Sequence, residues 1–162
     1  MDTTTWLCGN PPSSGQRQRY PGRFEYNLRK YYNPEGLDVL HMFSGSCSWG
    51  MTTDARPETG ADIIAPYDKL PDIGPFDMVI ADPPYNAGFA QEWQKELPKP
   101  KWIAREAMKV LKPNGLFLLL HIIVLPAYKE LGMERVAIHP VLCGPNNAIR
   151  VLNVMRKKLE TD

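Results

Sequence analysis

The longest apolar stretch of this 162-residue chain, from Leu116 to Val124, is the feature that most constrains its fold. Gly115 and Pro126 bound the stretch, and only His121 interrupts it. A strand that faces water on one side alternates apolar with polar residues, whereas a strand buried on both faces is apolar throughout. The stretch is also too short to cross a bilayer. It therefore predicts a strand in the middle of a sheet.

Other segments add strands and helices around this one. Five further strand-like runs lie at 38–43, 51–53, 76–81, 134–142 and 148–155. The last two are separated by Cys143–Asn147, which is typical of a hairpin loop. A helix is predicted at Lys101–Leu111, where Ile103, Ala107 and Val110 form one apolar stripe, and a shorter helix at 25–32. The alternation predicts an α/β fold with a mostly parallel sheet and a closing antiparallel hairpin.

Length and composition favour one domain. We expect an arm and short helix over residues 1–36 and the main domain over 37–158, because residues 1–22 are rich in Pro, Gly and Ser. The net charge of +1 means that any nucleic-acid contact needs a local basic patch. Residues 17–30 supply five basic side chains, which form either a solvated arm or a phosphate-contacting one.

The cysteines and the N-terminus exclude some classes of protein. Cys8, Cys47 and Cys143 are three in number, widely spaced and without a CxxC pair, so neither a disulfide framework nor a zinc site is expected. The first residues do not have the pattern of a signal peptide. The sequence therefore predicts a cytoplasmic protein with no membrane partner.

A turn of small residues follows the strand at 38–43. Phe43, Ser44, Gly45 and Ser46 come where the strand ends, and small residues there let the backbone approach a ligand closely. In open α/β sheets, ligands bind at the carboxyl ends of the strands. A structural turn without a ligand is the alternative. The turn lacks the GxGxxG pattern of dinucleotide sites, which argues against NAD.

Asp54 follows the weak strand at 51–53. A carboxylate at the end of a second strand can accept hydrogen bonds from two ribose hydroxyls. Asp54-Ala55-Arg56-Pro57 is also typical of a turn, so that Asp54 is alternatively a cap of the local backbone.

The strand at 76–81 leads directly into Asp82-Pro83-Pro84-Tyr85. Proline fixes φ and lacks an N–H, so the two prolines make a stiff, extended turn. Such a turn can present the Asp82 carboxylate and a backbone carbonyl as two fixed acceptors, which match the two N–H donors of an amino group. The Tyr85 ring offers a flat face on which a base can stack.

At these motifs the chain resembles the amino-methyltransferase group of class I S-adenosylmethionine (AdoMet)-dependent methyltransferases. Asp82–Tyr85 matches the D-P-P-Y signature of that group, and Phe43–Ser46 resembles its F-x-G-x-G motif with Ser46 in place of the second glycine. Leu111–Leu116 is similar to its L-K-P-G-G segment. The resemblance covers about residues 37–157 and implies a Rossmann-like methyltransferase sheet.

The resemblance also implies a reaction and a set of site residues. The cofactor would be AdoMet, held by Phe43–Ser46, Asp54 and Asp82. The catalytic turn would be Asp82–Tyr85, methylating an amino group of a nucleic-acid base, with DNA adenine N6 slightly favoured. Substrate contacts are expected from four further residues, namely Asn86, Phe89, Trp93 and His121. His41 and His139 are expected to be structural.

Several alternatives stay open. An RNA base and DNA cytosine N4 share the same four-residue signature. A non-catalytic AdoMet-binding subunit that needs a partner is another possibility, and a glutamine or small-molecule amine is a third substrate class. The helix that usually follows the first strand is expected to be very short or missing. Because no room is expected for a target recognition domain, a single protomer should show low sequence specificity, or act as a homo-oligomer or with a recognition partner.

Overall fold

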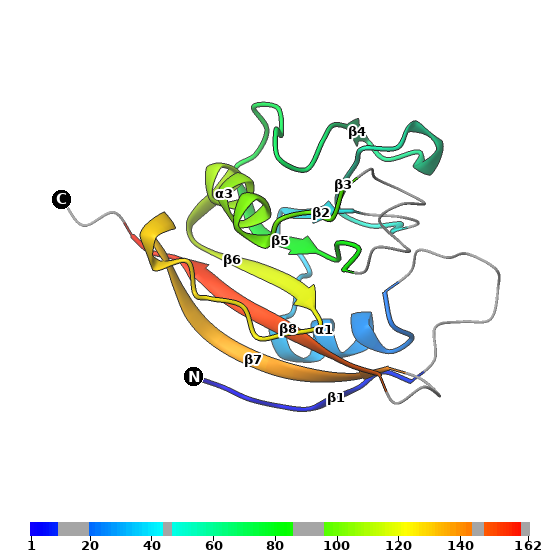
Figure 1. Cartoon of the computed structure of the whole chain (residues 1–162), viewed down its shortest axis with the longest axis vertical. Helices are drawn as coiled ribbons and strands as arrows, with labels where there is room; N and C mark the ends of the chain where they lie inside the picture. Colours follow the sequence, from blue (N-terminus) through cyan, green and yellow to red (C-terminus); the bar gives the residue numbers. More distant parts are fainter. Residues whose placement is uncertain (10–19, 44–46, 86–95, 144–147, 160–162) are drawn as a thin grey trace.

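The computed structural model of the chain describes residues 1–9, 20–43, 47–85, 96–143 and 148–159. Figure 1 shows a single twisted sheet with helices packed on it. The strands are β1 (Trp6–Leu7), β2 (Val39–Met42), β3 (Met51–Asp54), β4 (Ile63–Ile64), β5 (Phe76–Ala81), β6 (Leu111–His121), β7 (Met133–Cys143) and β8 (Ala148–Lys157). The helices are α1 (Phe24–Tyr32) and α3 (Pro100–Val110), with short 3-10 turns at Pro57–Thr59 and Lys129–Leu131.

The eight strands lie in the order β1-β7-β8-β6-β5-β2-β3-β4. All neighbouring pairs are parallel except β6–β8 and β7–β8, so that β8 alone runs against the others. The predicted mostly parallel α/β sheet with a C-terminal antiparallel hairpin is confirmed.

Alternate residues of the central strands point to opposite faces of the sheet. Val79 and Ala81 pack with Ile103 and Ala107 of α3, whereas Met78 packs in a second cluster with residues of α1. Burial on both faces explains why these strands are continuously apolar. The two helices therefore lie on opposite faces of the sheet (Figure 1).

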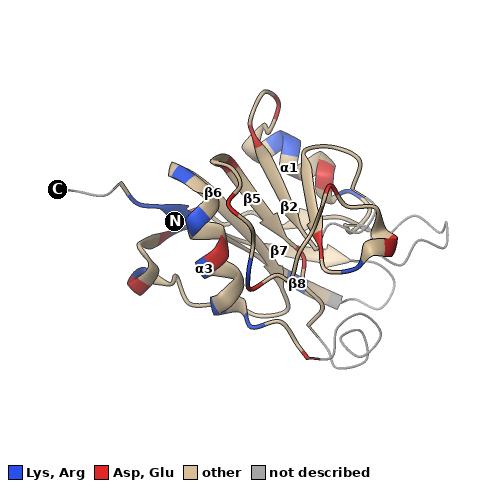
Figure 2. Cartoon of the chain, turned by 90° about the horizontal axis from the view of Figure 1, so that it is seen from above, with Lys and Arg blue, Asp and Glu red and all other residues tan. Residues whose placement is uncertain are grey.

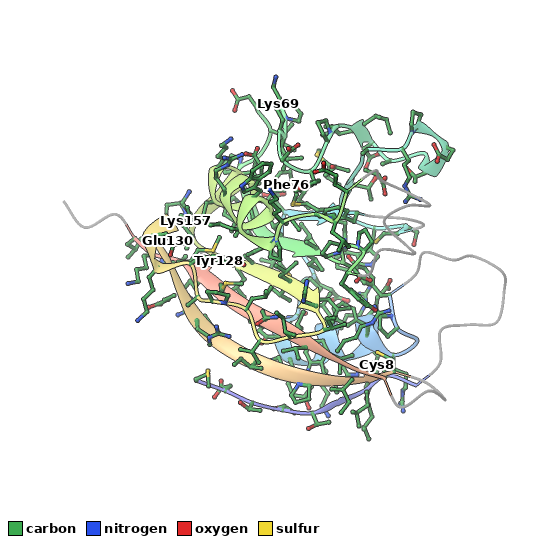
Figure 3. All side chains as sticks on the ribbon, viewed as in Figure 1. Cys8, Lys69, Phe76, Tyr128, Glu130 and Lys157 are labelled. Carbon is green, nitrogen blue, oxygen red and sulfur yellow. The ribbon has the colours of Figure 1, made fainter. Side chains whose placement is uncertain are left out.

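The end of α3 is fixed by β8. The Lys157 ammonium donates hydrogen bonds to the carbonyls of Met108 and Leu111, each 2.8 Å away. Figure 3 shows where Lys157 lies among the side chains. A cation near the last carbonyls of a helix also interacts favourably with the helix dipole. The helix begins and ends one residue before the predicted Lys101–Leu111, and α1 begins one residue before its predicted start.

The central strand is shifted toward the N-terminus relative to the prediction, since β6 begins at Leu111 rather than at Leu116 and ends before Val124. Leu116–Val124 was expected to be extended throughout, but β6 ends at His121, opposite Val151 of β8. The buried Asn153 side chain explains this end, because it accepts from the Leu125 N–H at 2.8 Å and donates to the Ile123 carbonyl at 3.1 Å. These bonds hold the backbone away from the sheet, and residues 122–124 are about half exposed.

The prediction that residues 1–22 form only a loop or arm is wrong for Trp6–Leu7. These residues form β1, with Trp6 opposite Val141 of β7. The Trp6 ring is fully buried and stacks on His139 at a centroid distance of 5.1 Å. Two residues are too few to show a period in the sequence, so that only the packing reveals this strand. β4 was missed for the same reason, and the boundary between arm and domain at residue 36 stays a prediction.

The described residues also bear on the other expectations. The segment from Cys47 to Gly50 carries no helix, and all three cysteines are free thiols. Among the residues that the structure covers, no helix is long and apolar enough to cross a membrane, and no three potential metal ligands cluster. Charges of both signs occur on α1 and on α3, so neither helix is uniformly basic (Figure 2).

Candidate active site

The candidate site lies at one edge of the sheet, where β2, β3, β5 and β6 have their carboxyl ends. These four strands are parallel, so the residues that follow them meet at that edge. β2 leads into Phe43, β3 ends at Asp54, β5 leads into Asp82, and β6 ends at His121. The structure thus brings together the described residues that the sequence assigned to a cofactor and a substrate.

The first part of the site is a pocket beyond the ends of β2 and β3. Its lining consists of Met42, Phe43, Thr53, Asp54, Ala55, Ala65 and Tyr67. Phe43 has a left-handed backbone (φ 58°), and its ring lies 5.6 Å from that of Tyr67. A non-glycine residue in this conformation is uncommon and clusters at functional sites. Ser44, Gly45 and Ser46, which were predicted to continue this wall, lie outside the described residues.

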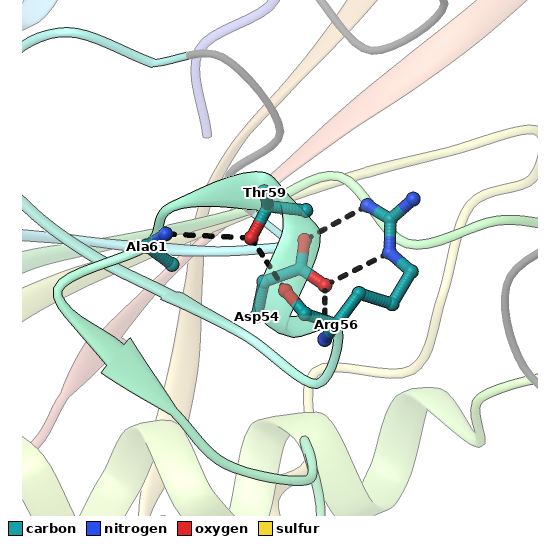
Figure 4. A network of polar contacts seen from close by, with 4 residues as sticks. All are labelled: Asp54, Arg56, Thr59 and Ala61. Carbon is teal, nitrogen blue, oxygen red and sulfur yellow. Dashed lines mark hydrogen bonds and ion pairs between the residues drawn. The ribbon is translucent and has the colours of Figure 1, made fainter.

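Asp54 lies in this pocket and is almost fully buried. Its Oδ1 accepts from the Arg56 backbone N–H and from Arg56 Nε, both at 3.0 Å, and its Oδ2 accepts from Arg56 Nη2 at 3.0 Å (Figure 4). The predicted cap of the local backbone is therefore present. A ribose that used both carboxylate oxygens would have to share them with Arg56 or displace it.

The Arg56 turn is itself held in place. The Thr59 hydroxyl donates to the Arg56 carbonyl at 2.8 Å, and the Ala61 N–H donates to the Thr59 hydroxyl at 3.4 Å (Figure 4). The pocket wall beyond β3 is thus built by contacts between residues close in sequence.

The second part of the site is the turn after β5. Pro83 and Pro84 are buried, and the Asp82 side chain is only 18% exposed. Burial raises the pKa of the Asp82 carboxyl to about 6, while the nearby Arg150 guanidinium acts in the opposite direction. Asp82 is therefore mostly ionised at neutral pH and can act as a hydrogen-bond acceptor.

Two rings and a guanidinium surround this turn. Arg150 Nη1 lies 3.5 Å from Asp82 Oδ1, and Arg150 Cζ lies 4.9 Å from the centre of the Tyr85 ring. The His121 ring lies 6.0 Å from the Tyr85 ring, and burial lowers the His121 pKa so that the imidazole is neutral near pH 7. His121 Nδ1 is buried and has no hydrogen-bond partner among the described residues.

Several predicted site residues cannot be placed, and one residue at the site was not predicted. Asn86, Phe89 and Trp93 lie outside the described residues. Arg150 was missed, although it is the only charged residue in the run from Ala148 to Met155. A lone charge in a run that is otherwise uncharged and mostly apolar could have drawn attention to it.

The two histidines expected to be structural have structural partners. Burial lowers the pKa of His41 to about 4, and its Nδ1 lies 2.8 Å from the Tyr20 hydroxyl. His139 Nε2 lies 2.5 Å from the Tyr32 hydroxyl. Each therefore joins the sheet to the segment that contains α1.

Comparison with known proteins shows likeness in structure only. No known family and no curated protein matches the sequence. TrmN from Thermus thermophilus superposes with a TM-score of 0.58 and 17% identity, covering 82% of this chain and 47% of TrmN. The 16S rRNA N2 G1207 methyltransferase RsmC from T. thermophilus has a TM-score of 0.54 and 16% identity, and the match covers 91% of this chain and 45% of RsmC.

A third similar structure is the N-methyltransferase NodS from Bradyrhizobium japonicum WM9. Its TM-score is 0.56 at 11% identity, and the match covers 85% of this chain and 95% of NodS. The chain spans about half the length of TrmN and RsmC. With the strand order and the closing hairpin, these matches show that the chain has the Rossmann-like fold of class I AdoMet-dependent methyltransferases.

Proposed function

We propose that this chain is an AdoMet-dependent methyltransferase that acts on an exocyclic amino group of a nucleic-acid base. The observation that carries the proposal is the turn after β5, in which two buried prolines hold a mostly buried, ionisable carboxylate beside an aromatic ring. DNA adenine N6 is the substrate position that we favour first. RNA bases and DNA cytosine N4 present the same chemistry.

The pocket beyond β2 and β3 has the chemistry to hold AdoMet. The rings of Phe43 and Tyr67 and two alanines give it apolar walls, and Asp54 gives it a carboxylate. An adenosine needs both, since its base packs against apolar side chains and its ribose donates to a carboxylate. RsmC was crystallised with AdoMet and guanosine, and NodS with S-adenosyl-L-homocysteine, which supports the same cofactor for this fold.

When bound, AdoMet supplies a methyl group on a positively charged sulfur. The amino nitrogen of a base is a weak nucleophile because its lone pair is delocalised into the ring. Hydrogen bonds from that amino group to Asp82 and to the Pro83 carbonyl would favour a pyramidal nitrogen and localise its lone pair. Transfer of the methyl group from the sulfur would place positive charge on that nitrogen, which the Asp82 carboxylate would stabilise, and the extra proton would then leave to water.

The names of two structural neighbours bear on the substrate. RsmC methylates N2 of a guanine in rRNA, which is an exocyclic amino group, whereas a methyltransferase from Burkholderia thailandensis acts on N1 of 1,6-didemethyltoxoflavin. The fold therefore serves both nucleic acids and small molecules. The acidic turn beside Tyr85 is what favours a base with an amino group in this chain.

A direct assay tests the proposal. The full chain is incubated with radiolabelled AdoMet and a panel of single- and double-stranded DNA, RNA, protein and free nucleosides, and the digested products are identified by mass spectrometry. We expect label on N6 of adenine or another base amino group, with Asp82→Ala as the inactive control. Label on a protein side chain or on oxygen would contradict the proposal, as would calorimetry showing binding of NAD or ATP but not of AdoMet.

A further inference from the structure

Arg150 lies at the candidate site although it is far from the other site residues in sequence. It is on β8, next to Val151, which pairs with His121 at the carboxyl end of β6. This position places it at the same edge of the sheet as the turn after β5. Its contact with Asp82 joins residues 68 positions apart, so the antiparallel return of β8 creates it.

The guanidinium of Arg150 contacts the two groups that the proposed reaction needs, the Asp82 carboxylate and the Tyr85 ring. Its Nη1 is 3.5 Å from Asp82 Oδ1, and its Cζ is 4.9 Å from the centre of the Tyr85 ring. A guanidinium is planar, carries N–H donors at its edge and stacks on aromatic faces. An amino-substituted base has the same three properties, so both would compete for the same carboxylate and ring.

The effect of this arginine differs before and during the reaction. Before a substrate arrives, it offsets the burial that raises the Asp82 pKa, and so favours the charged carboxylate. During methyl transfer, a guanidinium 3.5 Å from that carboxylate would compensate its charge and repel the positive charge growing on nitrogen. The same contact thus favours the resting site and opposes the transition state.

We propose that Arg150 is a positioning residue that serves as the counterion of Asp82 while no substrate is bound. The substrate displaces Arg150 when its amino group donates to the Asp82 carboxylate and its ring stacks on Tyr85. The inference rests on the proposed function, because it assigns the displacement to the base amino group. The pair has the accessibility that an exchange requires, since Arg150 and Asp82 side chains are 25% and 18% exposed.

Other titratable groups near the turn cannot replace Arg150 as the counterion. Tyr20, Tyr85 and Cys143 interact electrostatically with Asp82, and burial raises the pKa of all three. They are therefore neutral near pH 7. His121, beside Tyr85, is neutral there because burial lowers its pKa. Among the described residues whose charge reaches Asp82, the cation is Arg150.

The counterion role can be tested without any activity. The titration of Asp82 is followed by carbon-13 NMR of its carboxyl group in the full chain, assigned by comparison with Asp82→Asn. We expect Arg150→Gln to raise the Asp82 pKa by about one unit or more, because an adjacent opposite charge has an effect of about 1–3 units. In Arg150→Lys, the pKa of Asp82 should stay near its value in the parent protein. Arg156→Gln, on the same strand but paired with Glu134, is the matched control. An unchanged pKa in Arg150→Gln would overturn the inference.

The displacement is tested by the pH dependence of methyl transfer. kcat/KM reports the pKa values of the free enzyme, and kcat those of the substrate complex. In Arg150→Gln, we expect the acid limb of kcat/KM to move up by about one pH unit while that of kcat stays in place. If both limbs move, Arg150 stays on Asp82 during the reaction and the displacement is wrong. If methyl transfer is slower by the same factor at every pH, and the acid limbs of kcat/KM and kcat both stay in place, Arg150 has a structural role only. If no base is methylated, the proposed function and the displacement both fail, while the NMR titration still decides the counterion role.

Discussion

Two carboxylates end parallel strands at the same edge of the sheet, and each faces an arginine, yet the two pairs differ in origin and strength. Asp54 and Arg56 are two residues apart, and three hydrogen bonds of 3.0 Å join them, with side chains that are only 2% and 14% exposed. Asp82 and Arg150 are 68 residues apart, with a single 3.5 Å ion pair between more exposed side chains.

This comparison indicates which of the two acidic sites can open. A pair with several short hydrogen bonds between close neighbours in sequence is part of the local backbone structure. A longer, single contact across the sheet costs less to separate and leaves an acceptor in reach of a ligand. We therefore infer that the Asp54–Arg56 pair stays intact and forms a wall of the cofactor pocket. The Asp82–Arg150 pair faces the substrate and can exchange its partner. The predictions below test this difference.

The largest effect is expected from Asp82→Ala. Loss of a preorganised acceptor typically lowers kcat by about 10²–10³-fold, and methyl transfer should fall at least that far while AdoMet still binds. Radiolabel transfer and calorimetry measure the two effects separately. Asp77→Ala is the matched control, because Asp77 is at the other end of the same strand and pairs with Lys112 at 3.0 Å. Near-normal turnover of a folded Asp82→Ala protein would place the active site elsewhere.

The Asp54 pair should affect the cofactor rather than turnover. Hydrogen bonds to a charged group contribute about 1.5–3 kcal/mol, so Asp54→Ala should weaken AdoMet binding about tenfold to a hundredfold. Arg56→Ala should weaken it by a smaller factor, because the guanidinium that orients both carboxylate oxygens is lost while the backbone N–H at position 56 still binds Oδ1. Calorimetric titration with AdoMet checks both variants, with the exposed Glu58→Ala as a control. Unchanged or tighter binding in Arg56→Ala would show that the free carboxylate, rather than the intact pair, forms the cofactor wall.

Tyr85→Ala should act mainly on the substrate. Stacking of a base on an aromatic ring contributes about 1–3 kcal/mol, so KM for the nucleic acid should rise between about fivefold and a hundredfold. Tyr85→Phe and Tyr85→Trp should keep most of the activity, because the ring stacks. Steady-state kinetics compare the three variants. If Tyr85→Phe is as impaired as Tyr85→Ala, the hydroxyl rather than the ring is what acts.

The last effect acts on folding rather than on activity, and it is the contribution of Asp82 to the pH dependence of stability. Its pKa is about 6 in the folded chain against 3.8 for an unperturbed aspartate, so between these values the folded state binds more protons than the unfolded state. Stability should therefore fall by about 2 kcal/mol as the pH rises from 4 to 6. Activity should rise over the same range, since the charged carboxylate is the acceptor.

Urea unfolding at several pH values measures this contribution. In Asp82→Asn the fall attributable to residue 82 should disappear, because an amide does not titrate. An identical pH dependence of stability in the parent and in Asp82→Asn would mean that burial does not shift this carboxyl.

The sequence by itself determined the elements whose signal is local. The apolar period of α3, the strand that leads into Asp82-Pro83-Pro84-Tyr85 and the hairpin at the C-terminus are all specified within short windows, and the structure contains each of them. The Asp54–Arg56 turn belongs to the same class, because the four consecutive residues 54–57 are enough to predict that Asp54 caps the local backbone. Such features depend on backbone preferences and on burial, which neighbouring residues fix.

Only the tertiary structure decided the contacts between distant segments. The sheet order places Arg150 of β8 on Asp82, Trp6 of β1 opposite Val141, and Asn153 where it ends β6. No short window contains these pairs, because strand neighbours are chosen by how the whole sheet buries its two faces. The local sequence therefore specified a carboxylate in a stiff turn, whereas the antiparallel return of the last strand decided which cation meets it.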